Sequence, residues 1–116
     1  MNYSISLDGG ITTVALTGFA MIDAWEKVIE RLTGEAAVSQ GTRLMLVIHG
    51  VLGFMGIPER RYLGELLAEK FAHLSKVAVV VEAQKVTGVV EGAAQGRGLT
   101  LRVFSDDRAA HHWLSA

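Results

Sequence analysis

The side chains that could do chemistry in this 116-residue chain gather in one segment, residues 49–61 (HGVLGFMGIPERR). His49 opens the segment, and Arg60 and Arg61 close it. A histidine can act as a general base near neutral pH, whereas arginines bind carboxylates and phosphates. No nucleophile or second carboxylate flanks His49 in the sequence. We therefore expect His49 to be structural or to contact a ligand, and we predict no catalytic residue. An enzyme that uses His49 is the weakest of the open hypotheses.

The same segment alternates glycines with large apolar side chains. Gly50, Gly53 and Gly56 recur at every third position. Between them and just beyond lie Val51, Leu52, Phe54, Met55 and Ile57. Glycine permits unusual φ angles and a close approach to a ligand. This spacing matches neither the dinucleotide-binding nor the P-loop motif, so nucleotide binding has no support.

Three interpretations of residues 49–61 remain open. The apolar tip could fold back as a lid over the core, with the arginines solvated. It could line a pocket for a small apolar or amphipathic ligand whose acidic end an arginine holds. It could also insert into a membrane surface or a groove of a partner, with the arginines near anionic headgroups.

Other polar and aromatic residues are weaker candidates. Adjacent helical residues point about 100° apart, so His111 and His112 are poorly placed to share a metal ion. Residues 82–85 (EAQK) follow a predicted strand and could line the same crevice, although a polar turn is the simpler interpretation. Trp25 and Trp113 fit core or edge packing, with a dimer contact at Trp113 also open. We predict no metal and no cofactor.

Composition excludes several classes of protein. The net charge is −1, so the chain has no broad basic field for nucleic acid. It has no cysteine, which excludes a disulfide framework, a thiolate zinc site and a cysteine nucleophile. No apolar run approaches the roughly 20 residues that span a bilayer, and the N-terminus does not resemble a signal peptide. We expect one cytoplasmic domain over residues 1–116, peripheral at the membrane if the third interpretation holds.

Hydrophobic periodicity predicts an α/β domain with the order β-β-α-β-α-β-α-β-α. The predicted strands are residues 2–7, 11–17, 43–48, 76–82 and 99–104. The first two flank an Asp-Gly-Gly turn typical of a hairpin. The later strands are continuous apolar runs, which indicates burial on both faces. We expect a mixed, mostly parallel five-stranded sheet flanked by about four helices.

The predicted helices cover residues 22–36, 58–74 and 84–96, followed by a C-terminal helix that Ser105 caps. Pro58 suits the first turn of a helix, where its missing N–H is not needed. In the third helix, Ala93 and Ala94 lie beside glycines, which indicates a helix pressed closely on its neighbour.

Three stretches carry a resemblance to a known group of proteins. They are VIHGVLGFMGIPE at 47–59, KVAVVVE at 76–82 and LTLRVFSDDRAAHHWL at 99–114. Together with the element order, they resemble the SpoIIAA-like superfamily. It includes the STAS domains and the stand-alone STAS/SEC14-like bacterial proteins of uncharacterised function. The resemblance implies a mixed sheet flanked by helices.

In anti-sigma factor antagonists of that superfamily, the loop after the third strand carries an Asp-Ser-Ser-Gly-like motif with a phosphorylatable serine. Aligning Phe54-Met55 with the apolar pair before that motif places residues 56–59 (GIPE) over it, and no hydroxyl remains. The resemblance therefore implies a domain without the phosphorylation switch.

We predict a non-enzymatic SpoIIAA-like domain that binds an apolar or amphipathic ligand, or a membrane surface, through residues 49–61. The predicted contact residues are His49, Gly53, Phe54, Met55, Ile57, Arg60 and Arg61. The alternative is a regulatory module that binds a protein partner and lacks the phosphorylatable serine. A homodimer is also open.

Overall fold

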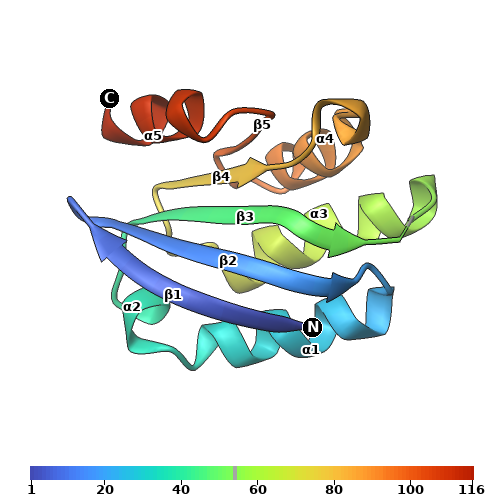
Figure 1. The fold of residues 1–116 in the computed structure, drawn as a ribbon, viewed down its shortest axis with the longest axis horizontal. Coiled ribbons are helices and arrows are strands. Elements are labelled where there is room, and N and C mark those ends of the chain that lie inside the picture. Colours follow the sequence, from blue (N-terminus) through green and yellow to red (C-terminus); the bar gives the residue numbers. More distant parts are fainter. Residues whose placement is uncertain (54) are drawn as a thin grey trace.

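A computed structural model describes residues 1–53 and 55–116 and confirms the predicted α/β architecture. Five strands pair in consecutive order, with β1 antiparallel to β2 and all other pairs parallel (Figure 1). The strands are β1 (Asn2–Asp8), β2 (Ile11–Phe19), β3 (Arg43–Leu52), β4 (Lys76–Val80) and β5 (Leu101–Phe104).

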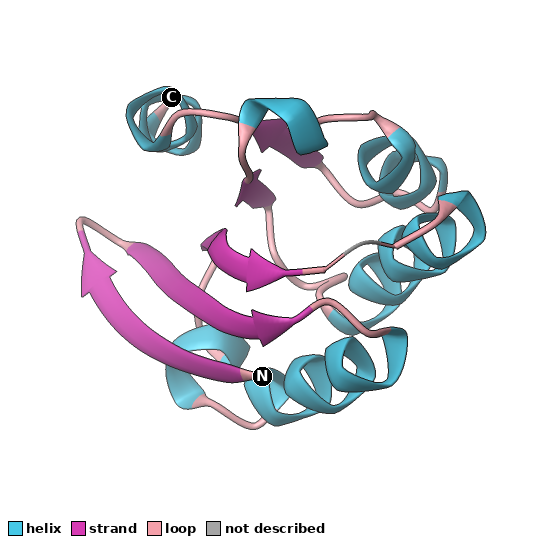
Figure 2. Cartoon of the chain, turned by 45° about the vertical axis from the view of Figure 1, so that its right-hand side comes forward, coloured by secondary structure: helices cyan, strands magenta, loops and turns pink. Residues whose placement is uncertain are grey.

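Helices cover both faces of this sheet unequally. The helices are α1 (Ile22–Thr33), α2 (Ala36–Ser39), α3 (Ile57–Lys70), α4 (Val89–Gly96) and α5 (Asp107–Ser115), with a 3-10 turn η1 (Ala83–Lys85). Helices α1 to α4 pack on one face and α5 packs alone on the other, as the turned view shows (Figure 2).

The alternation of side chains along the strands explains the two hydrophobic cores. Successive strand residues point to opposite faces of a sheet. In β4, Val77 and Val79 enter the large core under α1 to α4, whereas Ala78 and Val80 enter the small core under α5. Because both faces of β4 are covered, its sequence is a continuous apolar run.

The large core is filled by side chains that are almost wholly out of water. Leu44 of β3, Leu67 of α3 and Phe71 just after α3 are all buried. Burying a side chain of this size contributes about 1.5–3 kcal/mol to folding. This core fixes α3 against the sheet, and so fixes the segment that precedes α3.

Several predicted helix boundaries are wrong, for local reasons. Helix α3 ends at Lys70, with Phe71 as its C-cap, and not at residue 74. Helix α1 ends at Thr33, and its C-cap is Gly34. The helix predicted from residue 84 begins only at Val89, because Gly88 has a left-handed φ of 80°. The last helix is capped by Asp106, whose carboxylate accepts a hydrogen bond from the Arg108 N–H at 3.1 Å, and not by Ser105.

The close approach of α4 to its neighbour is confirmed, but the glycine that allows it lies on α3. A Cβ at Gly64 would lie 2.5 Å from the Val90 carbonyl oxygen and 2.7 Å from Ala93 Cβ. A Cβ added at Gly92 or Gly96 of α4 would meet no atom within 4 Å, so both of these glycines face open space. Gly64 therefore sets the distance between α3 and α4.

Candidate ligand-binding site

The segment predicted as one loop, residues 49–61, is mostly regular structure. Strand β3 continues to Leu52, because β2 runs alongside it as far as Phe19. The Ala20 N–H then donates a hydrogen bond to the Leu52 carbonyl at 2.6 Å. Helix α3 already begins at Ile57. The prediction of a long loop is therefore wrong, since pairing with β2 satisfies the backbone of its first half.

A bulge in β3 accommodates one extra residue. Ala15 pairs with Val47 and Thr17 pairs with Gly50, so β3 advances three residues while β2 advances two. A Cβ at Gly50 would lie 2.7 Å from the Thr17 methyl carbon and 3.2 Å from the Leu16 carbonyl oxygen. Gly50 thus permits the approach of the neighbouring strand at the bulge.

Only one of the three glycines in the segment needs a left-handed backbone. Gly53 has φ +98°, which places the turn between β3 and α3 in a conformation that favours glycine. Gly56 is the N-cap of α3 with φ −74°, a value that any residue adopts. The expectation that all three glycines provide unusual φ angles holds for Gly53 alone.

An apolar cavity of about 90 Å³ lies at the carboxyl ends of β3 and β4. It is enclosed by the sheet together with α1, α3 and α4. Its walls include Leu46 and Val51 of β3, Leu63 of α3, Val79 of β4 and Val90 of α4. In open α/β sheets, ligands bind outside the carboxyl ends of the strands. The cavity lies at the carboxyl ends of two parallel strands, although the consecutive strand order has no switch point between β3 and β4.

The structure brings some predicted site residues to this cavity and leaves others away from it. Gly53, Met55 and Arg60 line it. Ile57 and Arg61 are exposed and lie outside the lining. Phe54, the remaining predicted contact of the apolar tip, lies outside the described residues.

His49 is exposed at the bulge and does not line the cavity. It lies close enough to Glu82 for its charge to act on that carboxylate. The pKa of Glu82 is lowered chiefly by a hydrogen bond from its own backbone N–H, and the charges of Lys85 and His49 lower it further. Burial opposes this shift. The carboxylate of Glu82 is thus held in its ionised form.

Lys85 lines the cavity and is partly exposed to solvent. Its ammonium group donates a hydrogen bond to the Val51 carbonyl at 3.1 Å and pairs with Glu82 Oε2 at 3.4 Å. Lys85 lines the cavity, whereas Glu82 does not. Residues 82–85 do border the crevice, as one sequence hypothesis allowed, but no sequence signal singled out Lys85.

Trp25 of α1 also lines the cavity, whereas sequence reasoning expected it only in core or edge packing. Its side chain is 3% exposed, and it lines the cavity. Its indole Nε1–H has no hydrogen-bond partner among the described residues. Most buried donors in proteins are paired, so an unpaired one beside a cavity needs an explanation.

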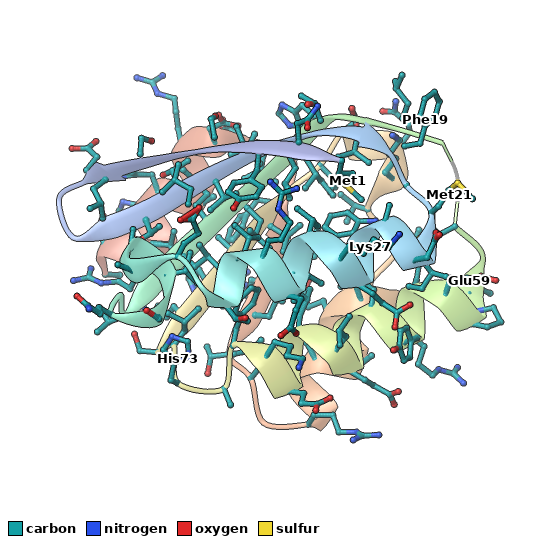
Figure 3. All side chains as sticks on the ribbon, turned by 90° about the horizontal axis from the view of Figure 1, so that it is seen from below. Met1, Phe19, Met21, Lys27, Glu59 and His73 are labelled. Carbon is teal, nitrogen blue, oxygen red and sulfur yellow. The ribbon has the colours of Figure 1, made fainter. Side chains whose placement is uncertain are left out.

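Large apolar side chains lie exposed around the cavity end of the sheet. We call Phe19, Met21, Leu52 and Ile57 the apolar rim; they are 66%, 62%, 59% and 60% exposed. Phe19 and Leu52 are register partners at the ends of β2 and β3. Phe19 and Met21 lie at the same end of the molecule as Glu59, with His73 at the opposite end (Figure 3). Sequence reasoning did not connect Phe19 or Met21 with residues 49–61.

Two other kinds of site have no support in the described part of the chain. Residues 1–53 and 55–116 contain no group of three His, Cys, Asp or Glu side chains that could hold a metal ion. Within the same residues, no helix is long and apolar enough to cross a membrane.

Comparisons with known proteins support the fold. No family model matches this chain, and no curated protein matches its sequence. An anti-sigma factor antagonist from Mycobacterium paratuberculosis has a similar structure, with a TM-score of 0.65 and 15% identity over 99% of this chain and 94% of that one. An uncharacterised DUF3478-family protein with a SpoIIAA-like fold from Shewanella loihica gives a TM-score of 0.58 and 16% identity, over 97% and 92% of the two chains. The predicted SpoIIAA-like fold is therefore confirmed.

Proposed function

We propose that this SpoIIAA-like domain binds a small apolar or amphipathic ligand in the cavity at the carboxyl ends of β3 and β4, and that it catalyses no reaction on it. The observation that carries the proposal is an apolar cavity at the carboxyl ends of the strands whose lining includes a few polar side chains, among them Lys85 and Trp25. Ligand pockets are typically apolar with a few placed polar groups.

The size of the cavity limits the ligand. Its volume is about 90 Å³. A dry protein cavity of about 150 Å³ holds benzene, and one water molecule occupies about 30 Å³ of liquid. The apolar part of the ligand is therefore short, comparable to a few carbon atoms. A longer chain would exceed this volume.

The polar residues of the cavity support binding without catalysis. Nucleophilic catalysis needs a nucleophile beside a general base. Among the described lining residues there is one hydroxyl, Thr87, and no histidine, aspartate or glutamate. The Thr87 hydroxyl also lies 3.5 Å from the Val89 N–H at the start of α4. This arrangement favours a binding role for the cavity.

The proposal is tested with a larger side chain at residue 90, which would fill the cavity. Val90 lines it, whereas its neighbour Val89 lies on the groove at the other side of α4. We would measure the thermal unfolding of the wild type with acids, alcohols and amides of four to six carbon atoms. A ligand at 100 times its Kd should stabilise the domain by about 2.7 kcal/mol.

Val90→Phe should abolish this ligand-dependent shift, and the matched Val89→Phe should preserve it. If the wild type responds to no compound of the panel, the cavity does not bind small apolar ligands. An equal response of the wild type and Val90→Phe would place binding elsewhere.

A second candidate function is supported by the apolar rim. Contiguous exposed apolar side chains on a protein surface are typical of contacts with proteins or membranes. The structural similarity to an anti-sigma factor antagonist favours a protein partner. Because residues 56–59 carry no hydroxyl, such binding would not be switched by phosphorylation at those positions.

Two leucines give a matched test of the rim. Leu52 is 59% exposed within the rim, and Leu7 is 66% exposed at the hairpin end of β1, away from the rim. Leu52→Ser should weaken flotation with anionic liposomes, or capture of a defined protein partner, and Leu7→Ser should not. Equal behaviour of both variants would contradict a role for the rim.

A further inference from the structure

The polar side chains that line the cavity share one property, which is that each can donate a hydrogen bond. The indole of Trp25, the ammonium of Lys85 and the guanidinium of Arg60 carry donors and no acceptor. Thr87 can both donate and accept. No carboxylate, amide or imidazole side chain is present among the described lining residues. A ligand that fits this lining presents acceptors.

Two carboxylates lie near the cavity without lining it, and the Oε2 atoms of Glu59 and Glu82 are buried with no hydrogen-bond partner among the described residues. Glu82 pairs with Lys85 from outside the lining, and its own backbone N–H also bonds it. Glu59 Oε2 lies 2.8 Å from the position of a Cβ at Gly56, and Glu59 does not line the cavity either. Neither acid belongs to the cavity lining, and the Glu82 carboxylate, 3.4 Å from the Lys85 ammonium, is the negative charge that a bound anion would meet there.

Lys85 is the cation best placed to meet an anionic group. An ammonium carries three donors. The Val51 carbonyl takes one of them at 3.1 Å, and Glu82 is paired with the group at 3.4 Å. The side chain is 36% exposed, so the group is reachable from solvent at the mouth of the cavity. One donor remains for a ligand while both protein contacts are kept.

Trp25 adds an independent observation. Trp25 is only 3% exposed, and its Nε1–H has no hydrogen-bond partner among residues 1–53 and 55–116. An unpaired buried donor is unfavourable until an acceptor arrives.

We propose that the ligand is a small monocarboxylic acid bound as its anion, with its short apolar tail in the cavity and its carboxylate on Lys85. This inference rests on the proposed function, since it names the chemical class of the ligand for the same cavity.

The experiment compares three ligands of one shape by isothermal titration calorimetry: pentanoate, pentanamide and pentan-1-ol. The wild type should bind pentanoate about tenfold more tightly than pentanamide, because a charge-assisted hydrogen bond is the stronger kind. Lys85→Met should reduce the preference to about one while it retains binding of pentan-1-ol, because the apolar walls are unchanged.

Two further variants make the result specific. Lys85→Arg keeps the positive charge and should restore a preference for pentanoate. Lys76→Met makes the same change in a lysine at the opposite end of β4, and should leave the preference as in the wild type. Circular dichroism would show that each variant is folded.

Each outcome distinguishes the inference from the function on which it rests. Equal binding of the three ligands by the wild type would overturn the carboxylate and leave the cavity as an apolar site. Binding of none of them would overturn the proposed function as well. A preference for pentanoate that survives in Lys85→Met would overturn the assignment of Lys85.

Discussion

The two ends of β3 and β4 use similar side chains in opposite ways. At the amino ends, Arg43 and Lys76 are register partners. Arg43 donates to the Leu114 carbonyl at 2.8 Å, and Lys76 donates to the Trp113 and Ala116 carbonyls at 2.9 and 3.0 Å. These cations satisfy the last carbonyls of α5 and complement its dipole. This end of the sheet is closed by the chain itself.

At the carboxyl ends of the same strands, hydrogen bonding and packing are less complete. Lys85 bonds one carbonyl there, but the Trp25 indole N–H has no partner in the described chain, and an apolar cavity remains. The comparison teaches that polar groups alone do not mark a site. We expect the site where buried polar atoms lack hydrogen-bond partners and packing leaves a cavity, because departures of this kind from a well-packed fold are typical of functional sites.

The largest expected effect tests the contact that closes the cavity wall. Gly64→Ala forces a methyl group against the Val90 carbonyl and Ala93, neither of which can move without shifting α4. We expect the free energy of unfolding to fall by about 1–3 kcal/mol, as for other overpacked sites. Urea denaturation measures it.

The matched control is Gly92→Ala on α4, where a new methyl group meets nothing within 4 Å. It should raise the free energy of unfolding by about 0.4–1 kcal/mol, because the unfolded chain loses freedom. A neutral Gly64→Ala would show that Gly64 does not hold α3 and α4 at this distance. A destabilised Gly92→Ala would show that α4 does not tolerate an added methyl group at an open position.

The next effect compares the two lysines directly. Lys76→Met removes two hydrogen bonds to α5. It also removes a cation–π contact, in which the Lys76 ammonium lies 5.2 Å from the centre of the Trp113 ring. We expect a loss of about 1–2 kcal/mol in the free energy of unfolding. Lys85→Met removes one hydrogen bond and the partly exposed ion pair with Glu82, and should lose less than Lys76→Met, about 1 kcal/mol. If thermal and urea unfolding rank the two variants in the reverse order, the carboxyl end is as firmly closed as the amino end.

The smallest expected effect concerns pH. The folded-state pKa of Glu82 lies below its ordinary value of 4.5, so its ionised form is favoured by folding. This stabilisation is present above pH 4.5 and is lost as the pH falls through the lower, folded-state pKa. Melting temperatures of wild type and Glu82→Gln should therefore converge as the solution is acidified. A constant difference across that range would contradict the lowered pKa.

Much of the fold could be predicted because it depends on local patterns. The run VAVV of β4 indicates a strand covered on both faces, and two cores on opposite faces of β4 confirm it. The errors came from single residues whose conformation depends on context. The left-handed Gly88 delays α4, and Asp106 rather than Ser105 caps α5.

The candidate site divides in the same way. Gly53, Met55 and Arg60 were predicted, because they belong to one stretch that follows a central strand. Residues 82–85 were named only as an alternative lining of the crevice, without a signal for Lys85 itself, and no signal in the sequence placed Trp25 there. The extension of β3 to Leu52 also escaped prediction, because it depends on pairing with β2 more than 30 residues earlier.

The amino-acid sequence by itself determined the order of the five strands and the four main helices, because side-chain periodicity and turn residues act over a few neighbouring positions. Only the tertiary structure decided that Trp25, Val51 and Lys85 surround one cavity and that Phe19 lies beside Leu52. Those relations depend on the register of parallel strands and on the distance that Gly64 sets between α3 and α4. Both are long-range quantities that no local pattern encodes.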